Sequence, residues 1–337
     1  CSVLVFLFTG LNSQKPLPDA EKIGWLTTFA LQMKVAFISR ATLYTSPGGD
    51  TKQLDLTAQN LRTMGVEVDV YLAFEKIDYG KYDLLHFFNI IRPGDTIKHI
   101  KQSGKPYVVS TIFVEYGTVK QHIGTAQKIL SSLFGEDGLE YIKALARAVK
   151  NGEKIVSKEY ILKGHKASIK YVAENAAMLL PNSESEYRRL AAKYGIEKPY
   201  RVVPNGINTD CAAKEYPFSE KYKGAILCMG RIEARKNQLA LVRALNNTSY
   251  RLYIHGKPSP NAMAYYEQCK AEAAPNIHIE GHLDDEELFT AYSNAKVHVL
   301  PSYFETTGLS SLEAAVMGCN IVVTDKGDTR DYFKDDA

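Results

Sequence analysis

Short apolar runs rich in β-branched residues alternate along the chain with longer segments whose apolar residues recur at helical spacing. Leu54, Ala58, Leu61 and Met64, for example, share one face of an expected helix that ends at Gly65. The runs expected to form strands are 35–39, 66–72, 84–88, 107–112, 178–181 and 200–204, followed by 225–229, 251–254, 276–279, 297–300 and 320–324. This alternation predicts parallel sheets with right-handed crossover connections.

The alternation pauses at a polar stretch, residues 205–223. We therefore predict an α/β protein with two doubly wound, Rossmann-like domains, 33–204 and 224–337, which face each other across a cleft and are joined by a linker at 205–223. Residues 1–32 are expected to be an extension outside the core, because the first strong start is Met33. No helix follows the last strand, so the C-terminal domain is expected to be truncated. Ligands of such sheets lie beyond the carboxyl ends of the strands.

Composition excludes several classes of protein. The 337 residues are 45% apolar and 23% charged, which is typical of a globular protein and not of a disordered one. The net charge of 41 − 38 = +3 gives no argument for nucleic acid. The five cysteines are widely spaced and form no C-x-x-C, so we expect neither a disulfide framework nor a zinc site. Dinucleotide-binding, P-loop, zinc-protease and serine-hydrolase motifs are absent, as is Asp-x-Asp.

The strongest candidate site follows the expected strand 297–300. Glu305 would lie at the carboxyl end of this strand, and Ser310 would cap a helix with Glu313 near its start. The backbone N–H groups of Leu309 and Ser310 would then form an anion site. Two carboxylates beside such a site suit a ligand that carries both hydroxyls and phosphate. The alternative is that Glu313 only complements the helix dipole and that Glu305 is a solvated loop residue.

Three further candidates lie after expected strands. Arg231 and Lys236 follow the first strand of the second domain, where they would offset the charge of a diphosphate or simply begin a solvated basic helix. Gly48 and Gly49 would let the backbone approach a ligand closely, or form a plain tight turn. His86, at the carboxyl end of an expected strand, is either a residue of the cleft or a core residue with satisfied hydrogen bonds.

These features occur together in the order of a known family. Gly230-Arg231 with Lys236-Asn237, Glu305-x7-Glu313 with Gly308-Leu309, Pro204-Asn-Gly-Ile207 and Gly48-Gly49 resemble the retaining glycosyltransferases of family four, which have the GT-B fold. The resemblance runs from about Met33 to the end of the chain. It implies that the second domain binds a nucleotide-sugar donor and that the first binds the acceptor.

The resemblance also implies a role for each candidate residue. Arg231 and Lys236 would hold the donor's diphosphate, Glu313 would bind ribose hydroxyls, Glu305 would face the donor sugar, and His86 would lie near the transferred sugar. His86, Glu305, Arg231 and Lys236 are thus the expected catalytic residues. The expected donor-binding residues are Gly48, Gly49, Arg231, Lys236, Glu305, Gly308, Leu309, Ser310 and Glu313.

The function implied by the resemblance is transfer of a sugar from a UDP-, GDP- or ADP-sugar to a glycan or lipid-linked acceptor, in the synthesis of polysaccharides or glycoconjugates. Such an enzyme would be a retaining, metal-independent hexosyltransferase without a cofactor. A non-catalytic sugar-nucleotide-binding module, and another GT-B enzyme such as a phosphorylase or an epimerase, are the alternatives.

One basic region stands apart from these motifs. Residues 141–170 carry eight Lys and Arg residues and two Glu, a local charge of 8 − 2 = +6, with apolar residues between them. This composition is typical of a basic amphipathic face for anionic lipid, or of a solvated face or an acceptor-phosphate site. We therefore expect a cytoplasmic protein that works at the inner face of the membrane if this region docks there.

Overall fold

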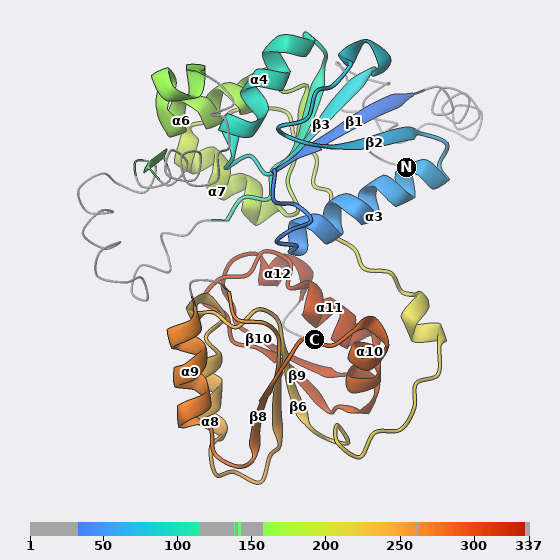
Figure 1. The fold of residues 1–337 in the computed structure, drawn as a ribbon, viewed down its shortest axis with the longest axis vertical. Coiled ribbons are helices and arrows are strands. Elements are labelled where there is room, and N and C mark those ends of the chain that lie inside the picture. Colours follow the sequence, from blue (N-terminus) through green and yellow to red (C-terminus); the bar gives the residue numbers. More distant parts are fainter. Residues whose placement is uncertain (1–32, 115–137, 139–140, 143–157, 260–261, 334–337) are drawn as a thin grey trace. The chain divides into compact units, whose positions relative to one another are not determined.

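The computed structural model describes residues 33–114, 138, 141–142, 158–259 and 262–333. These residues form two compact units, one that ends at Pro204 and one that begins at Asn205 (Figure 1). Each unit is built on a five-stranded parallel sheet with helices between successive strands, so the predicted α/β class is confirmed. The expected extension at residues 1–32 lies outside the described residues, as do residues 143–157 of the basic region.

The first unit has the strand order β2-β1-β3-β4-β5. Its strands are β1 (Lys34–Ser39), β2 (Glu67–Leu72), β3 (Leu84–Phe88), β4 (Tyr107–Ser110) and β5 (Met178–Leu180). Its helices are α3 (Gly49–Thr63), α4 (Pro93–Ser103), α6 (Lys158–Asn175) and α7 (Glu184–Tyr194), with a short 3-10 turn at Tyr79–Lys81. Apart from 200–204, every strand expected in this unit forms, some with shorter bounds.

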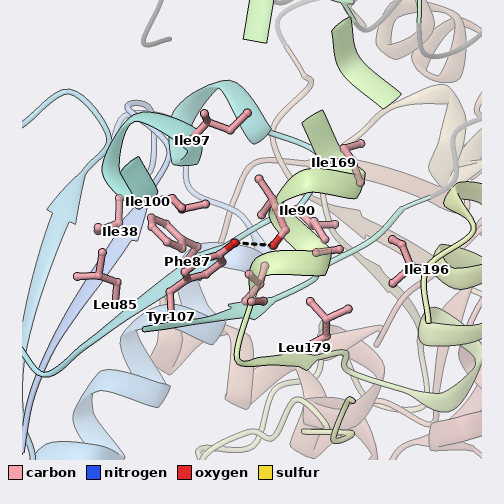
Figure 2. Close-up of a cluster of buried hydrophobic side chains, with 14 of the residues drawn as sticks. Ile38, Leu85, Phe87, Ile90, Ile97, Ile100, Tyr107, Ile169, Leu179 and Ile196 are labelled. Carbon is pink, nitrogen blue, oxygen red and sulfur yellow. Dashed lines mark hydrogen bonds between the residues drawn. The ribbon is translucent and has the colours of Figure 1, made fainter. Parts of the chain in front are cut away.

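Both faces of this sheet are buried, since successive side chains of a strand point to opposite sides. Phe37 and Phe88 belong to a cluster that includes Leu54 of α3, whereas Ile38 and Phe87 belong to a second cluster that includes residues of α4 and α6. Figure 2 shows this second cluster, in which the Tyr107 hydroxyl donates to the backbone oxygen of Val172 at 2.8 Å. Complete burial of one large apolar side chain contributes about 1.5–3 kcal/mol.

The strand expected at 107–112 ends two residues early, at Ser110. The residues that follow it bond to a buried carboxylate. Glu186 of α7 is fully buried and accepts hydrogen bonds from the Thr111 hydroxyl and from the Phe113 backbone N–H. Between them, Ile112 has a φ of 44°, a backbone conformation that a β-branched residue rarely adopts. The same carboxylate accepts from the Asn182 backbone N–H at 3.0 Å and so joins the ends of β4 and β5.

The second unit has the strand order β10-β9-β6-β7-β8. Its strands are β6 (Ile226–Met229), β7 (Leu252–His255), β8 (Ile277–Glu280), β9 (Val297–Leu300) and β10 (Asn320–Val323). Its helices are α8 (Gln238–Leu245), α9 (Met263–Glu272), α10 (Asp285–Asn294), α11 (Leu309–Val316) and α12 (Thr329–Tyr332), with 3-10 turns at Asp210–Ala213 and Ala234–Lys236 (η4). All five strands expected here are confirmed to within about one residue at each end. The expectation that no helix follows the last strand is wrong, because the short helix α12 follows β10.

Two segments differ from what the sequence predicts: residues 200–204, expected to form a strand, and residues 205–223, expected to form a linker. Residues 200–204 form no strand, although the Arg201 and Val203 N–H groups donate to carbonyls of Leu179 and Pro181. The segment 205–223 is bonded to the second unit at its start, where the Asn205 side chain donates to the Thr307 hydroxyl at 2.9 Å. Near its end, the backbone N–H of Ser219 donates to the Asn294 side chain.

Each strand order has one point at which the direction of winding reverses. In the first unit this switch point lies between β1 and β3, and in the second unit it lies between β6 and β9. Counted from its own first strand, the second sheet has the order 5-4-1-2-3, which is that of dinucleotide-binding folds. Ligands of such sheets bind beyond the carboxyl ends of the strands at the switch point. The fold therefore directs attention to the loops that follow β6 and β9.

Candidate donor site in the second unit

The loops after β6 and β9 bring together oppositely charged side chains. The Lys236 Nζ donates to Glu305 Oε1 at 2.5 Å, and the Arg235 guanidinium lies 3.5 Å from the same oxygen. Only 14% of the Lys236 side chain and 10% of the Glu305 side chain are exposed, so water screens the pair weakly. Two residues that are far apart in the sequence and that both belong to the predicted site are thus in direct contact.

Arg235, to which no sequence motif assigns a role, joins the same two loops at several points. Its guanidinium donates to the Phe304 carbonyl at 2.8 Å and pairs with Glu233 at 3.1 Å. Its own carbonyl accepts from the Tyr303 N–H at 2.9 Å. The only sequence signal for this role is that Arg235 stands next to Lys236.

Arg231 lies apart from this cluster. It is an exposed loop residue before η4, and within the described residues its side chain makes no hydrogen bond or ion pair, while its carbonyl accepts from Gln238. The alternative of a solvated basic helix start is wrong, because Lys236 belongs to η4 and α8 begins only at Gln238. The role of Arg231 in holding a diphosphate stays a prediction.

The charge of Glu305 is maintained by its neighbours. Burial by itself would raise the pKa of this carboxyl, but the charges of Lys236 and Arg235 outweigh it and hold the pKa below the ordinary value of 4.5. Glu305 is therefore ionised at neutral pH although it is buried. This excludes the alternative of a solvated loop residue.

The positions of these loops depend on two close approaches of the backbone. A Cβ atom on Gly327, which has a φ of 78°, would lie 2.0 Å from the Glu305 carbonyl oxygen. A Cβ atom on Gly256 would lie 1.9 Å from the Gly230 carbonyl oxygen. Glycine is required at both positions, because the atoms in the way belong to the backbone and cannot rotate aside.

The helix after Glu305 begins earlier than the sequence suggests. The N-cap of α11 is Gly308, with a φ of 67°, so the expected cap at Ser310 is wrong. Glycine has no Cβ atom and takes this left-handed conformation, which leaves Ser310 as the second helical residue. The Ser311 and Leu312 N–H groups bond to the Gly308 carbonyl. Within the described part of the chain we find no acceptor for the N–H groups of Leu309 and Ser310, which suits the predicted anion site.

Glu313 is consequently further from the helix start than expected. It is the fifth residue of α11, and it is buried with a relative exposure of 6%. The dipole effect of a helix falls off within its first turn, so the alternative role as a dipole residue is weakened. Burial, and then the charge of Glu313, raise the pKa of Tyr292 well above its ordinary range.

The glycine pair of the first unit forms a helix start and not a tight turn. Gly48 is the N-cap of α3 and Gly49 is its first residue. Arg40 organises the loop between β1 and this helix: its guanidinium holds Asp50 at 2.6 and 3.0 Å, the Thr42 carbonyl at 2.7 Å and the Ser46 carbonyl at 2.9 Å. The loop belongs to the switch point of the first sheet.

His86 lies in the middle of β3, two residues before its carboxyl end, which corrects the expected position. Its Nε2 atom is 2.9 Å from the Ser110 hydroxyl oxygen, and its ring stacks on Phe88 and meets the edge of Phe37. Burial lowers the pKa of His86 to about 3, so the ring is neutral. These contacts favour the core alternative, while the catalytic role stays a prediction.

The described residues contain neither a candidate metal site nor a helix that could span a membrane. No group of three or more His, Cys, Asp and Glu side chains is gathered there in a way that could hold a metal ion. None of the described helices combines the length and the apolar character that crossing a membrane requires. Cys211, Cys228, Cys269 and Cys319 are buried, free thiols.

Part of the chain is similar to proteins of a known family. Residues 213–337 match the sequence model of the family Glycosyl transferases group 1. The D-inositol 3-phosphate glycosyltransferase of Acidothermus cellulolyticus is 28% identical over 178 residues of the alignment, and the match covers 46% of this chain and 40% of that protein. The glycogen synthase of Mycobacterium tuberculosis is 29% identical over 135 residues, 37% of this chain and 32% of that protein. The matched region thus spans less than half the length of these relatives.

Solved structures agree with the fold. The sucrose-phosphate synthase of Thermosynechococcus elongatus has a TM-score of 0.64 and 17% identity, over 88% of this chain and 82% of that chain. HepE of Anabaena, solved in complex with UDP-glucose, has a TM-score of 0.58 and 13% identity, over 88% of this chain and 81% of that chain. The chain has the GT-B fold, and residues 213–337 of it are similar to the glycosyl transferases of group 1.

Proposed function

We propose that this protein is a retaining glycosyltransferase that uses a nucleoside diphosphate sugar. The observation that carries the proposal is the cluster of Lys236, Arg235 and Glu305 at the switch point of the second sheet, close in sequence to the helix start at Gly308. Cations and backbone N–H groups are the partners of a diphosphate, and an ionised, buried carboxylate is a partner of sugar hydroxyls.

Each part of the site then has a task. Lys236, with Arg231, stabilises the charge that develops on the leaving diphosphate, together with the N–H groups of Leu309 and Ser310. Glu305 orients the donor sugar. Glu313 accepts hydrogen bonds from ribose hydroxyls. No step in this scheme requires a metal, because the protein supplies the positive charge.

The first unit is proposed to bind the acceptor, while Gly48 and Gly49 keep the predicted role of binding the donor phosphate and His86 keeps the predicted role near the transferred sugar. Gly48 and Gly49 stand at the start of a 15-residue helix, where backbone N–H groups attract negative charge. His86 lies two residues before the end of β3, one of the two strands at that sheet's switch point. The acceptor itself is proposed to be a glycan or a lipid-linked sugar.

Donor choice and catalysis are tested together with UDP-, GDP- and ADP-glucose. HepE, a protein of the same fold, was solved with UDP-glucose, so UDP-glucose is the first donor to test. We expect one donor to raise the melting temperature, since a ligand bound only by the folded state stabilises it. The same donor should be consumed at an unchanged rate in excess EDTA. Binding without consumption would favour the non-catalytic module, and loss of turnover that Mg²⁺ or Mn²⁺ restores would overturn the metal-free scheme.

The basic region supports a proposal of membrane contact. Among its described residues, Leu162 is 84% exposed beside the exposed Ile161 and Lys163. Lys166 and Lys170 are exposed in the second part of α6, after the helix is interrupted at Gly164. Exposed apolar side chains among lysines favour the surface of an anionic membrane.

A vesicle assay tests this proposal. Binding to vesicles that contain an anionic lipid should fall as salt rises, because exposed charges are screened within about 8 Å at physiological ionic strength. Leu162→Ser should weaken this binding, whereas Phe218→Ser, which alters a 69% exposed side chain of the other unit, should not. Equal binding to neutral and anionic vesicles, or no binding to either, would contradict the proposal and favour the alternative that the basic region is a solvated face.

A further inference from the structure

The guanidinium of Arg235 connects three groups that belong to both loops of the candidate site. One terminal nitrogen donates to the Phe304 carbonyl at 2.8 Å and lies 3.5 Å from Glu305 Oε1, and the other pairs with Glu233 at 3.1 Å. Glu233 in turn accepts from the Ser259 hydroxyl at 2.7 Å. Arg235 is therefore anchored on the side away from Glu305, and its planar group has a fixed orientation.

Lys236 is held in a different way. Among the described residues, its ammonium group makes one hydrogen bond, of 2.5 Å, to Glu305. An ammonium group on a flexible stem can be redirected. Both cations share the single oxygen Oε1 of Glu305. A diphosphate that binds Lys236 must therefore compete with Glu305 for the same positive charge.

We propose that Arg235 is a positioning residue of the donor site, which holds Glu305 and the loop 301–305 in place so that Lys236 can turn its charge to the donor's diphosphate. The inference rests on the proposed function, because it assumes that Lys236 meets a diphosphate. In this role Arg235 does not contact the ligand, since the Arg235 guanidinium is directed to Glu233, Phe304 and Glu305.

The electrostatics of Glu305 give the reason for a second cation. Burial favours the neutral form of this carboxyl, and the two neighbouring cations oppose that effect. When Lys236 faces the phosphates, Arg235 remains as the cation that keeps the buried carboxylate ionised. Without Arg235, Lys236 would have to remain with Glu305, and the diphosphate would lose its partner.

Calorimetric titration with UDP distinguishes action through Glu305 from direct contact with the phosphates. Arg235→Ala should weaken UDP binding about tenfold. In a Glu305→Gln background the same substitution should change UDP binding less than twofold, because residue 305 then carries no negative charge that holds Lys236. Arg243→Ala removes an exposed pair with Glu272 and serves as the matched control, with no effect expected. Equal losses in both backgrounds would show that Arg235 acts on the phosphates directly and would overturn the proposal, as would no loss in either.

A measurement without ligand separates this proposal from the proposed function. Amide hydrogen exchange in residues 301–305 should become about tenfold faster in Arg235→Ala and stay unchanged in Arg243→Ala, because the Arg235 side chain holds this loop through the Phe304 carbonyl. Unchanged exchange in Arg235→Ala would overturn the positioning role. If the wild type binds none of UDP, GDP and ADP, the proposed function fails, and the exchange result still decides whether Arg235 holds the loop.

Discussion

Replacing Lys236 by alanine should lower kcat/KM for the donor by about 30- to 900-fold, which corresponds to about 2–4 kcal/mol of lost transition-state stabilisation. The reason is the position of Lys236 after β6 at the switch point of the sheet, where only 14% of its side chain is exposed. Steady-state rates of donor consumption measure this effect. A variant with the kcat/KM of the wild type would contradict the assignment of Lys236 to the diphosphate.

The same substitution should also lower the free energy of unfolding, because the buried carboxylate of Glu305 loses a charged partner and keeps only Arg235. We expect a loss of about 1–3 kcal/mol at pH 7. The folded state holds the pKa of Glu305 below 4.5, so the pair stabilises the fold above that pH and ceases to do so as the pH falls through the lowered value.

Urea unfolding at pH 7 and in steps below pH 4.5 tests the sign of this effect. The difference in unfolding free energy between wild type and Lys236→Ala should shrink as the pH falls. Lys221→Ala breaks an exposed pair with Glu280 in the same unit and is the control, with an expected loss of no more than about 1 kcal/mol. A difference that grows at acid pH would contradict the assigned ionisation of Glu305.

Hydrophobic periodicity predicts the two sheets well because most of their strands are buried on both faces. The expected strands 84–88 and 297–300 form with the same bounds, and both are short apolar runs that follow a polar segment. Residues 200–204 have the same apolar character but form no strand. Their N–H groups bond to carbonyls of Leu179 and Pro181, a partial pairing that a pattern of residue types cannot distinguish from a full one.

Local sequence patterns do not predict which side chains of the candidate site come into contact. Glu305 and Lys236 are 69 positions apart, and only the strand order places them in contact. Ser310 has the residue type of a helix cap, but Gly308 takes that position because of its left-handed backbone. Arg231 has the expected chemistry and is exposed, while the contacts to Glu305 come from Arg235. Which of several neighbouring cations meets a carboxylate is decided by the path of the backbone.

Gly327→Ala should be one of the most damaging small substitutions in the second unit. The new Cβ atom would lie 2.0 Å from the carbonyl oxygen and 2.9 Å from the carbonyl carbon of Glu305, whereas real Cβ contacts are essentially never below 3.0 Å. The segment that carries Glu305 must therefore move by about an ångström, and a displacement of that size in an active site costs about 100-fold in rate. The Asp328 N–H, which donates to the same carbonyl at 2.8 Å, would lose its geometry as well.

A second glycine of the same unit separates this contact from the cost of the backbone conformation alone. Gly318 follows α11 with a φ of 88°, close to the 78° of Gly327, but a Cβ atom there would meet nothing within 4 Å. Gly318→Ala should thus cost only about 1–2 kcal/mol, the penalty of a left-handed alanine. Gly327→Ala should cost about 1–3 kcal/mol more, the usual range for overpacking. Urea unfolding of both variants gives the two free energies, and donor consumption gives the rates. Equal losses of stability and of rate in the two variants would mean that the close approach of Gly327 does not determine the position of Glu305.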